Sequence, residues 1–205
     1  MKQKYDLIRS TCVPMNRENI DTDQIIPARF LKSVSRDEKF FGEHLFHDQR
    51  YNADGTPNAG FVLNDSKYSG KILVAGKNFG CGSSREHAAW AIAGYGFCAV
   101  ISSSFADIHK QNELNNFVIP VTVSEKFLAE LFESIASDPA VEVEINLPEA
   151  TVEICGKKLK EHFPISDFKK YCLANGLDDI DFLLENQDKT EVWESNYLRS
   201  WKNEF

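Results

Sequence analysis

The strongest constraint on the fold is an alternation of short apolar runs with helical segments in the middle of the chain. The apolar runs, five or six residues each, have the length of buried strands, and the segments between them favour helices. The expected strands are 71–75, 97–102 and 118–123, and the expected helices are 85–95, 105–116 and 125–136. Strands and helices that alternate at this spacing predict an α/β fold with a core of parallel strands.

The flanking segments add an antiparallel part and a helical end. Apolar and polar residues alternate in VEVEINL and ATVEICG, which predicts an antiparallel pair of strands after Pro139. Other expected elements are a strand at 5–13, an ordered loop at 14–32, a surface excursion with a helical part at 33–66, and helices from 166 onward. We expect one domain over residues 1–205, with a core at 1–165 and a helical extension at 166–205.

Three aromatic residues mark one face of that extension. Trp193, Tyr197 and Trp201 recur every four residues, a spacing that places them on the same side of a helix. Such a stripe predicts packing against the chain's own domain. The alternative is a contact with a partner subunit.

Charge and hydropathy argue against two classes of binding partner. The net charge of −8 makes the chain a poor candidate for nucleic acid, which needs clustered Lys and Arg side chains against its phosphates. No apolar run reaches the roughly 20 residues of a membrane-spanning helix, and the opening residues, MKQKYDLIRSTC, lack the apolar centre of a signal peptide. We therefore expect a cytoplasmic protein that binds neither nucleic acid nor a membrane.

The five cysteines do not form a metal-binding pattern. Cys12, Cys81, Cys98, Cys155 and Cys172 are irregularly spaced, and no CxxC pair occurs among them. The usual signatures of a zinc site or a self-contained iron–sulfur site are therefore missing. The sequence predicts reduced thiols and no metal or cofactor held by this chain.

The segment that carries chemistry is GKNFGCGSSREHAA at 76–89. Gly80 and Gly82 let the backbone approach a ligand closely, and the start of the helix that follows favours anions. Arg85 adds a planar guanidinium that fits a carboxylate with two parallel hydrogen bonds. The combination predicts an anion site, which a carboxylate or a phosphate would satisfy equally well.

Spacing alone favours a structural interpretation of the same segment over ligand binding. Ser83 and Glu86 fit the S-x-x-E capping box, in which both side chains only complete the start of the helix. Three other phosphate or catalytic motifs are excluded by the order of residues: the P-loop, the dinucleotide-binding turn and the nucleophile elbow. Cys81 is a less favoured candidate for a reactive thiol, and His87 is expected to be structural.

An earlier segment, NIDTDQIIP, places Asp21 and Asp23 two residues apart. Alternating carboxylates in a turn can orient a histidine, bind a cation, or cap local turns. The residue pattern alone favours turn capping.

Together these segments resemble the swivelling β/β/α domain of the aconitase superfamily. GCGSSREHAA at 80–89 is the most specific part, and NIDTDQIIPARFLK at 19–32 and SSSFADIHKQNELNN at 102–116 occupy the expected order along the chain. FGEHLFHDQRYNADGTPNAGFVLN at 41–64 is similar in particular to the small-subunit family of bacterial 3-isopropylmalate dehydratases. The resemblance covers essentially the whole chain.

The resemblance implies a hydro-lyase that works as two chains. It implies isomerisation of 2-isopropylmalate and 3-isopropylmalate through 2-isopropylmaleate, in leucine biosynthesis. It also implies a large partner subunit that carries a 4Fe-4S cluster, so that neither chain turns over the dicarboxylate substrate alone. A metabolite-binding module without catalysis, and a relative acting on citrate, homocitrate or methylcitrate, are the competing hypotheses.

The resemblance also implies roles for individual residues. Ser83 is the expected base, and Asp23 occupies the position of an aspartate that pairs with a histidine of the cluster-bearing part. Ser84 and Arg85 are expected to bind substrate. The scaffold of the turn is expected from Gly80, Cys81 and Gly82, and further substrate contacts from Arg29, Phe30, Leu31 and Lys32.

Overall fold

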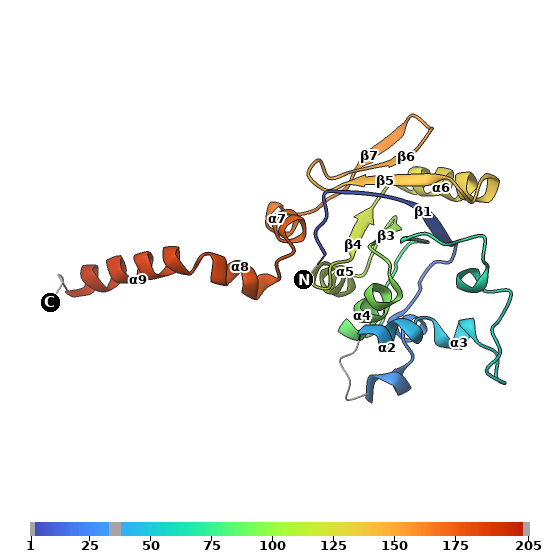
Figure 1. Ribbon diagram of the computed structural model, residues 1–205, viewed down its shortest axis with the longest axis horizontal. Helices are drawn as coiled ribbons and strands as arrows, with labels where there is room; N and C mark the ends of the chain where they lie inside the picture. Colours follow the sequence, from blue (N-terminus) through green and yellow to red (C-terminus); the bar gives the residue numbers. More distant parts are fainter. Residues whose placement is uncertain (1–2, 33–37, 203–205) are drawn as a thin grey trace.

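The computed structural model describes residues 3–32 and 38–202, and the seven strands in these residues form one mixed sheet (Figure 1). The strands are β1 (Leu7–Met15), β2 (Ile72–Ala75), β3 (Ala99–Ser102), β4 (Ile119–Thr122), β5 (Glu142–Asn146), β6 (Thr151–Ile154) and β7 (Leu159–His162). Their order across the sheet is β4-β3-β2-β1-β5-β6-β7. The predicted parallel core and antiparallel addition are thus both present, and the predicted α/β fold class is confirmed.

Strand β1 joins the two halves of the sheet. It pairs in parallel with β2, with Cys12 opposite Ile72, and antiparallel with β5, with Ile8 opposite Ile145. The parallel strands β2, β3 and β4 are buried almost throughout, which explains their continuous apolar sequences. The antiparallel part has three strands beyond β1, because β7 extends the predicted pair. Sequence LKEH of β7 is half exposed at the sheet edge and carries little apolar signal.

The described helices cover both faces of the sheet and extend beyond it. They are α1 (Thr22–Ile25), η1 (Ala28–Lys32), α2 (Glu38–Glu43), α3 (His47–Arg50), η2 (Val62–Asn64), α4 (Glu86–Tyr95), α5 (Asp107–Asn115), α6 (Glu125–Ser137), α7 (Asp167–Asn175), α8 (Asp179–Glu185) and α9 (Gln187–Lys202). The predicted loop at 14–32 therefore contains two short helices. The predicted excursion at 33–66 holds α2, α3 and η2, and its residues 33–37 lie outside the described part of the chain.

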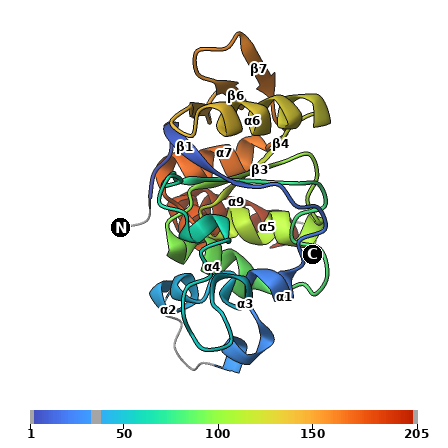
Figure 2. The same cartoon turned by 90° about the vertical axis from the view of Figure 1, so that its right-hand side faces the viewer.

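Alternate residues of the buried strands supply two apolar clusters. Ile72 and Val74 belong to the cluster that packs against α6, whereas Leu73 and Ala75 belong to the cluster that packs against α4. Figure 2 shows α6 on one side of the sheet, and α4 with α1, α2 and α3 on the other. The layer that contains α4 is the one that concerns the site, because the turn that follows β2 leads into α4.

Helix α2 docks on α4 through a contact between glycines. A Cβ added to Gly42 would lie 2.2 Å from the backbone carbon of Gly94, so the two helices approach more closely than any side chain allows. The excursion formed by α2 and α3 is held against the central helix by this contact.

A buried polar pair occupies the inner face of α5. Nε2 of His109 lies 3.0 Å from Oε1 of Glu113, one helical turn away, and both side chains are fully buried. Their atoms are close but not aligned as a hydrogen bond. Burial raises the pKa of the Glu113 carboxyl, and the charge of the neighbouring His109 only partly opposes this rise.

The C-terminal helices do not pack as the sequence predicts. Figure 1 shows α8 and α9 extending from α7 away from the rest of the chain. Trp193 and Tyr197 are exposed, so the prediction that their stripe packs on the chain's own domain is wrong. The side chain of Trp201, the third member, lies outside the described residues.

We predict that Gly42→Ala destabilises the fold. The added methyl group collides with backbone, which cannot rotate away, and overpacking of this kind costs about 2 kcal/mol. This loss exceeds the roughly 1 kcal/mol that alanine gains over glycine in a helix. Urea unfolding measures the difference, with Gly60→Ala as the control because a Cβ there meets its nearest atom only at 3.4 Å. A Gly42→Ala variant as stable as the parent would contradict the close helix contact.

We also predict that Glu113→Gln alters how stability depends on pH. Because the carboxyl pKa is raised in the folded chain, the folded state retains a proton that the unfolded chain releases. Wild-type stability therefore falls as pH rises above the ordinary value of 4.5, towards the folded pKa. Glutamine removes this loss, so the stability of the variant relative to wild type should increase as pH rises above the ordinary carboxyl pKa of 4.5.

Urea unfolding at several pH values tests this, with Glu133→Gln at an exposed position of α6 as the control for a lost charge. If wild type instead gains on the variant as pH rises, Glu113 is held ionised by His109 and the predicted sign is wrong.

Candidate active site

Two segments some 60 residues apart cross where β2 leaves the sheet and form the candidate site. The N–H of Gly80 donates to the Ile20 carbonyl at 2.8 Å, and the N–H of Thr22 donates to the Cys81 carbonyl at 3.0 Å. The Thr22 hydroxyl then donates to the Ser83 carbonyl at 2.8 Å. These bonds fix the glycine-rich turn against the loop that carries Asp21 and Asp23.

Gly80 is required by this crossing. Its φ of +73° lies in the left-handed region, and a Cβ would fall 2.1 Å from the ring of His109. The imidazole of His109, which belongs to α5, therefore packs directly against the turn and supports it. Phe79 packs edge-on against the same ring, with centroids 5.3 Å apart.

Ser83 and Ser84 are exposed at the end of the turn. Helix α4 begins at Glu86, with Arg85 as its N-cap residue and no side-chain hydrogen bond at the cap. The Glu86 carboxylate instead accepts a hydrogen bond from the side chain of Asn116. The capping box expected from Ser83 and Glu86 is therefore wrong, and the Ser83 hydroxyl is not used to begin the helix.

Arg85 and Asp23 form an ion pair across the two segments. The Arg85 side chain is 23% exposed and the Asp23 side chain 54% exposed, so the pair lies at an open surface. Exposed ion pairs contribute only about 0–1 kcal/mol. An arriving carboxylate can therefore compete for the guanidinium at small cost.

The two aspartates have different roles. Asp21 is the N-cap residue of α1, where its Oδ1 accepts from the Gln24 N–H at 2.7 Å. The favoured interpretation of this segment as turn capping is thus correct for Asp21 only. Asp23 points to Arg85 and joins the site.

A pocket of about 270 Å³ opens beside the turn. Its lining residues are Gly80, Gly82, Ser84, Ala106, Asp107, Ile108 and His109. It thus lies between the turn and the first residues of α5. Ser84 is the predicted substrate-binding residue that lines this space, together with Gly80 and Gly82 of the predicted scaffold.

Two further titratable side chains, Cys81 and His87, lie near the turn. Burial, together with the negative charge of Asp21, raises the pKa of the Cys81 thiol, which disfavours the reactive thiolate. Burial lowers the pKa of His87. The His87 ring packs against Trp90 and Phe41, with centroids 4.5 and 5.3 Å away. This packing agrees with a structural role for His87.

The predicted residues of η1 form a separate cluster. Arg29 pairs with Asp48, and one of its nitrogens lies 3.1 Å from Nδ1 of His47. The ring of Phe30 packs on His44 with centroids 4.1 Å apart. Leu31 and Lys32 follow in the same 3-10 helix. No hydrogen bond joins these residues to Ser83 within the described part of the chain.

Nothing in residues 3–32 and 38–202 resembles a metal site or a membrane span. No three His, Cys, Asp or Glu side chains there gather closely enough to hold a metal ion, so this part of the chain does not fit an iron–sulfur cluster. No helix in the same residues has the length and apolar character needed to cross a bilayer.

Sequence reasoning missed the residues that hold the turn in place. The roles of Thr22 and His109 depend on contacts with segments far away in the chain. The spacing of His109 and Glu113 by four residues is visible in the sequence, but it gives no sign that both are buried. The pair stands out only once the structure shows that this face of α5 points into the protein.

Comparison with known proteins gives the family. Residues 2–126 match the Aconitase C-terminal domain family. The 3-isopropylmalate dehydratase small subunit of Cytophaga hutchinsonii is 54% identical over 198 residues, covering 96% of this chain and 98% of the relative. That of Christiangramia forsetii is 52% identical over 192 residues, covering 94% and 93%.

A solved structure agrees with these sequences. The crystal structure of a 3-isopropylmalate dehydratase from Methanocaldococcus jannaschii superposes with a TM-score of 0.62 at 27% identity, covering 93% of this chain and 99% of that one. The shared mixed sheet, the matched domain and the identity over nearly the full length all agree. The chain therefore belongs to the aconitase superfamily and, within it, to the 3-isopropylmalate dehydratase small subunits.

Proposed function

We propose that this chain supplies the base and a carboxylate clamp to a site completed by a larger subunit. The proposed reaction interconverts 2-isopropylmalate and 3-isopropylmalate through 2-isopropylmaleate, in leucine biosynthesis. The observation that carries it is the exposed pair Ser83 and Ser84 next to Arg85, beside an open pocket, in a chain of this family. The exposed position suits a shared site, because another chain can cover the open side of the turn.

Ser83 is the proposed base. An ordinary hydroxyl holds its proton too tightly to act as one, so the alkoxide needs stabilisation by neighbouring positive charge. The start of α4 provides the positive end of a helix dipole, and Arg85 provides a permanent cation two residues away. Ser84 donates a hydrogen bond to substrate from the pocket side, and Gly80, Cys81 and Gly82 hold the backbone of the turn.

Arg85 is the proposed carboxylate clamp, and Asp23 holds it in the free subunit. Because their ion pair is exposed, substrate can replace Asp23 on the guanidinium. Asp23 is then available to the histidine of the large subunit that the family resemblance implies. Assembly and substrate binding would thus favour the same exchange of partners.

The recognition of the isopropyl group is assigned to η1. Phe30 and Leu31 offer apolar surface, and Arg29 and Lys32 offer positive charge for the second carboxylate. Arg29 is occupied by Asp48 in the free chain, at a position where both side chains are about half exposed. This exposure leaves the cluster free to rearrange around a ligand.

The large subunit is the proposed carrier of the 4Fe-4S cluster. That group supplies Lewis acidity to the leaving hydroxyl, a function for which the described residues of this chain have no ligand set. We place the complex in the cytoplasm, and the five free cysteines support that assignment.

Reconstitution tests the proposed function. The chain is mixed anaerobically with its large subunit and given isopropylmalate, citrate, homocitrate and methylcitrate in parallel, while the absorbance of the unsaturated intermediate is followed. We expect turnover of isopropylmalate only, and none from either chain alone. Preference for another acid would assign a different substrate, and ligand binding without turnover would indicate a sensor.

We predict that Ser83→Ala abolishes turnover without dissociating the complex. Loss of a positioned base typically lowers the rate about 10²–10⁴-fold, and an exposed serine can be replaced without disturbing the fold. The measurement is kcat and KM of the reconstituted pair, with gel filtration to confirm assembly. Ser137→Ala, at an exposed serine of α6, is the matched control. Full activity in Ser83→Ala would remove Ser83 from the mechanism.

A further inference from the structure

Helices α8 and α9 form an arm that leaves the body of the chain (Figure 1). Several of its apolar side chains face solvent. Large exposed apolar patches are rare on soluble proteins, and where they occur they mark contact surfaces. Trp193 is 63% exposed and Leu184 is 62% exposed. Among the arm residues whose side chains the structure describes, the exposed large apolar ones are Ile180, Leu183, Leu184, Val192, Trp193 and Tyr197.

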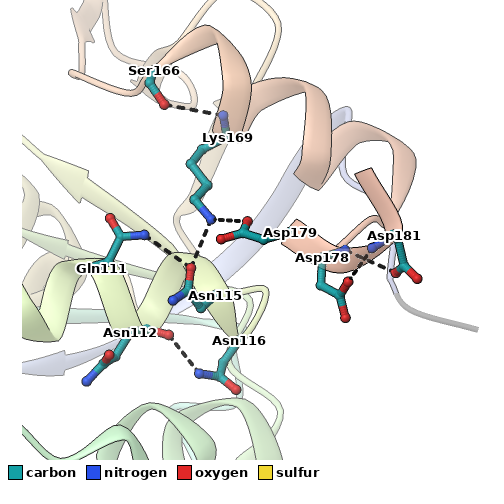
Figure 3. A network of polar contacts seen from close by, with 9 residues as sticks. All are labelled: Gln111, Asn112, Asn115, Asn116, Ser166, Lys169, Asp178, Asp179 and Asp181. Carbon is teal, nitrogen blue, oxygen red and sulfur yellow. Dashed lines mark hydrogen bonds and ion pairs between the residues drawn. The ribbon is translucent and has the colours of Figure 1, made fainter. Parts of the chain in front are cut away.

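The base of the arm is fixed to the core rather than hinged. Figure 3 shows the Lys169 ammonium of α7 between Asn115 of α5 and Asp179 of α8. Its Nζ lies 2.9 Å from the Asn115 Oδ1 and 2.6 Å from the Asp179 Oδ1. The ring of Phe182 packs edge-on against Phe168, with centroids 4.8 Å apart. The arm therefore leaves the core in a defined direction.

The first turn of α8 is stabilised independently. Asp178 accepts from the Asp181 N–H at 2.7 Å, and the Asp181 side chain accepts from the Asp178 N–H at 3.1 Å, which completes a capping box. Both residues are drawn in Figure 3. This capping box stabilises the start of α8, so the helix that carries Ile180 is formed before any partner binds.

A pocket of about 210 Å³ continues the apolar surface at the base of the arm. It lies between α5, α7 and α8, and its apolar lining includes Leu114, Phe117, Leu173, Leu177 and Ile180. The exposed face of α8 therefore leads directly into a cavity that can accept an apolar side chain from another protein. Interfaces with a buried anchor of this kind hold most strongly.

The charge of the arm selects between two possible occupants. Residues 178–202 contain seven Asp and Glu and three Lys and Arg, and the three are Lys189, Arg199 and Lys202, so the arm is acidic overall. Two such arms from copies of this chain would bring like charges together, at a cost to binding. A groove that is apolar at its centre and lined by Lys and Arg would match both the stripe and the carboxylates.

We propose that the arm formed by α8 and α9 is the docking element for the large subunit, which receives it in an apolar groove with a basic rim. The proposal rests on the proposed function, because that function supplies the partner. The arm then forms a second contact that is separate from the shared active site. It holds the large subunit while the turn at 80–85 remains free to engage substrate.

Binding of the full-length chain to the purified large subunit tests the proposal. Leu184→Glu and Trp193→Glu place a charge in the stripe at positions that are already exposed, so they should fold as the parent does. Each should weaken binding and so raise the dissociation constant roughly tenfold or more. Leu7→Glu, at a 52% exposed residue of β1, is the matched control and should bind like wild type. Circular dichroism confirms that all three variants fold.

The outcomes separate the arm from the function. If wild type and both arm variants bind the large subunit equally, the arm proposal fails and the proposed function stands. If wild type itself does not bind the large subunit, the proposed function fails as well. If ultracentrifugation shows a dimer of the isolated chain that Trp193→Glu dissociates, the arm joins two copies and the proposal is overturned.

Discussion

The crossing of the loop at 19–23 with the turn at 79–83 is the contact on which the site depends. Three hydrogen bonds join the two segments, and they place Asp23 and Arg85 within reach of each other. The crossing needs Gly80, because the ring of His109 leaves no room for a side chain there. His109, paired with the buried Glu113, is thus part of the support of the site.

The chemistry at this crossing follows from exposure as much as from residue type. Ser83 and Ser84 are exposed and are not used to begin α4, so their hydroxyls remain available. Arg85 is held by an exposed carboxylate rather than by a buried one, which keeps the cost of an exchange small. The same residues in a buried arrangement would form a static ion pair and a capped helix.

The two proposals place their tasks in different parts of the molecule. The turn before α4 carries the proposed catalytic groups beside a pocket, and the arm of α8 and α9 offers apolar and acidic surface. Lys169 couples the arm to α5, the helix whose other end lines the pocket. The proposed active site and the proposed docking contact therefore use different surfaces of the same chain.

The sequence by itself determined the α/β class, the parallel core and the position of the glycine-rich turn before α4, because strand and helix periodicities and a glycine-serine-arginine run are local patterns. It gave little sign of β7, whose residues alternate only weakly at an edge. Only the tertiary structure decided that Asp21 caps α1 while Asp23 pairs with Arg85, that His109 and Glu113 are buried under Gly80, and that Trp193 faces solvent. Each of these features depends on whether segments that are distant in the chain come into contact. The residue pattern within one segment does not encode which distant surface that segment will meet.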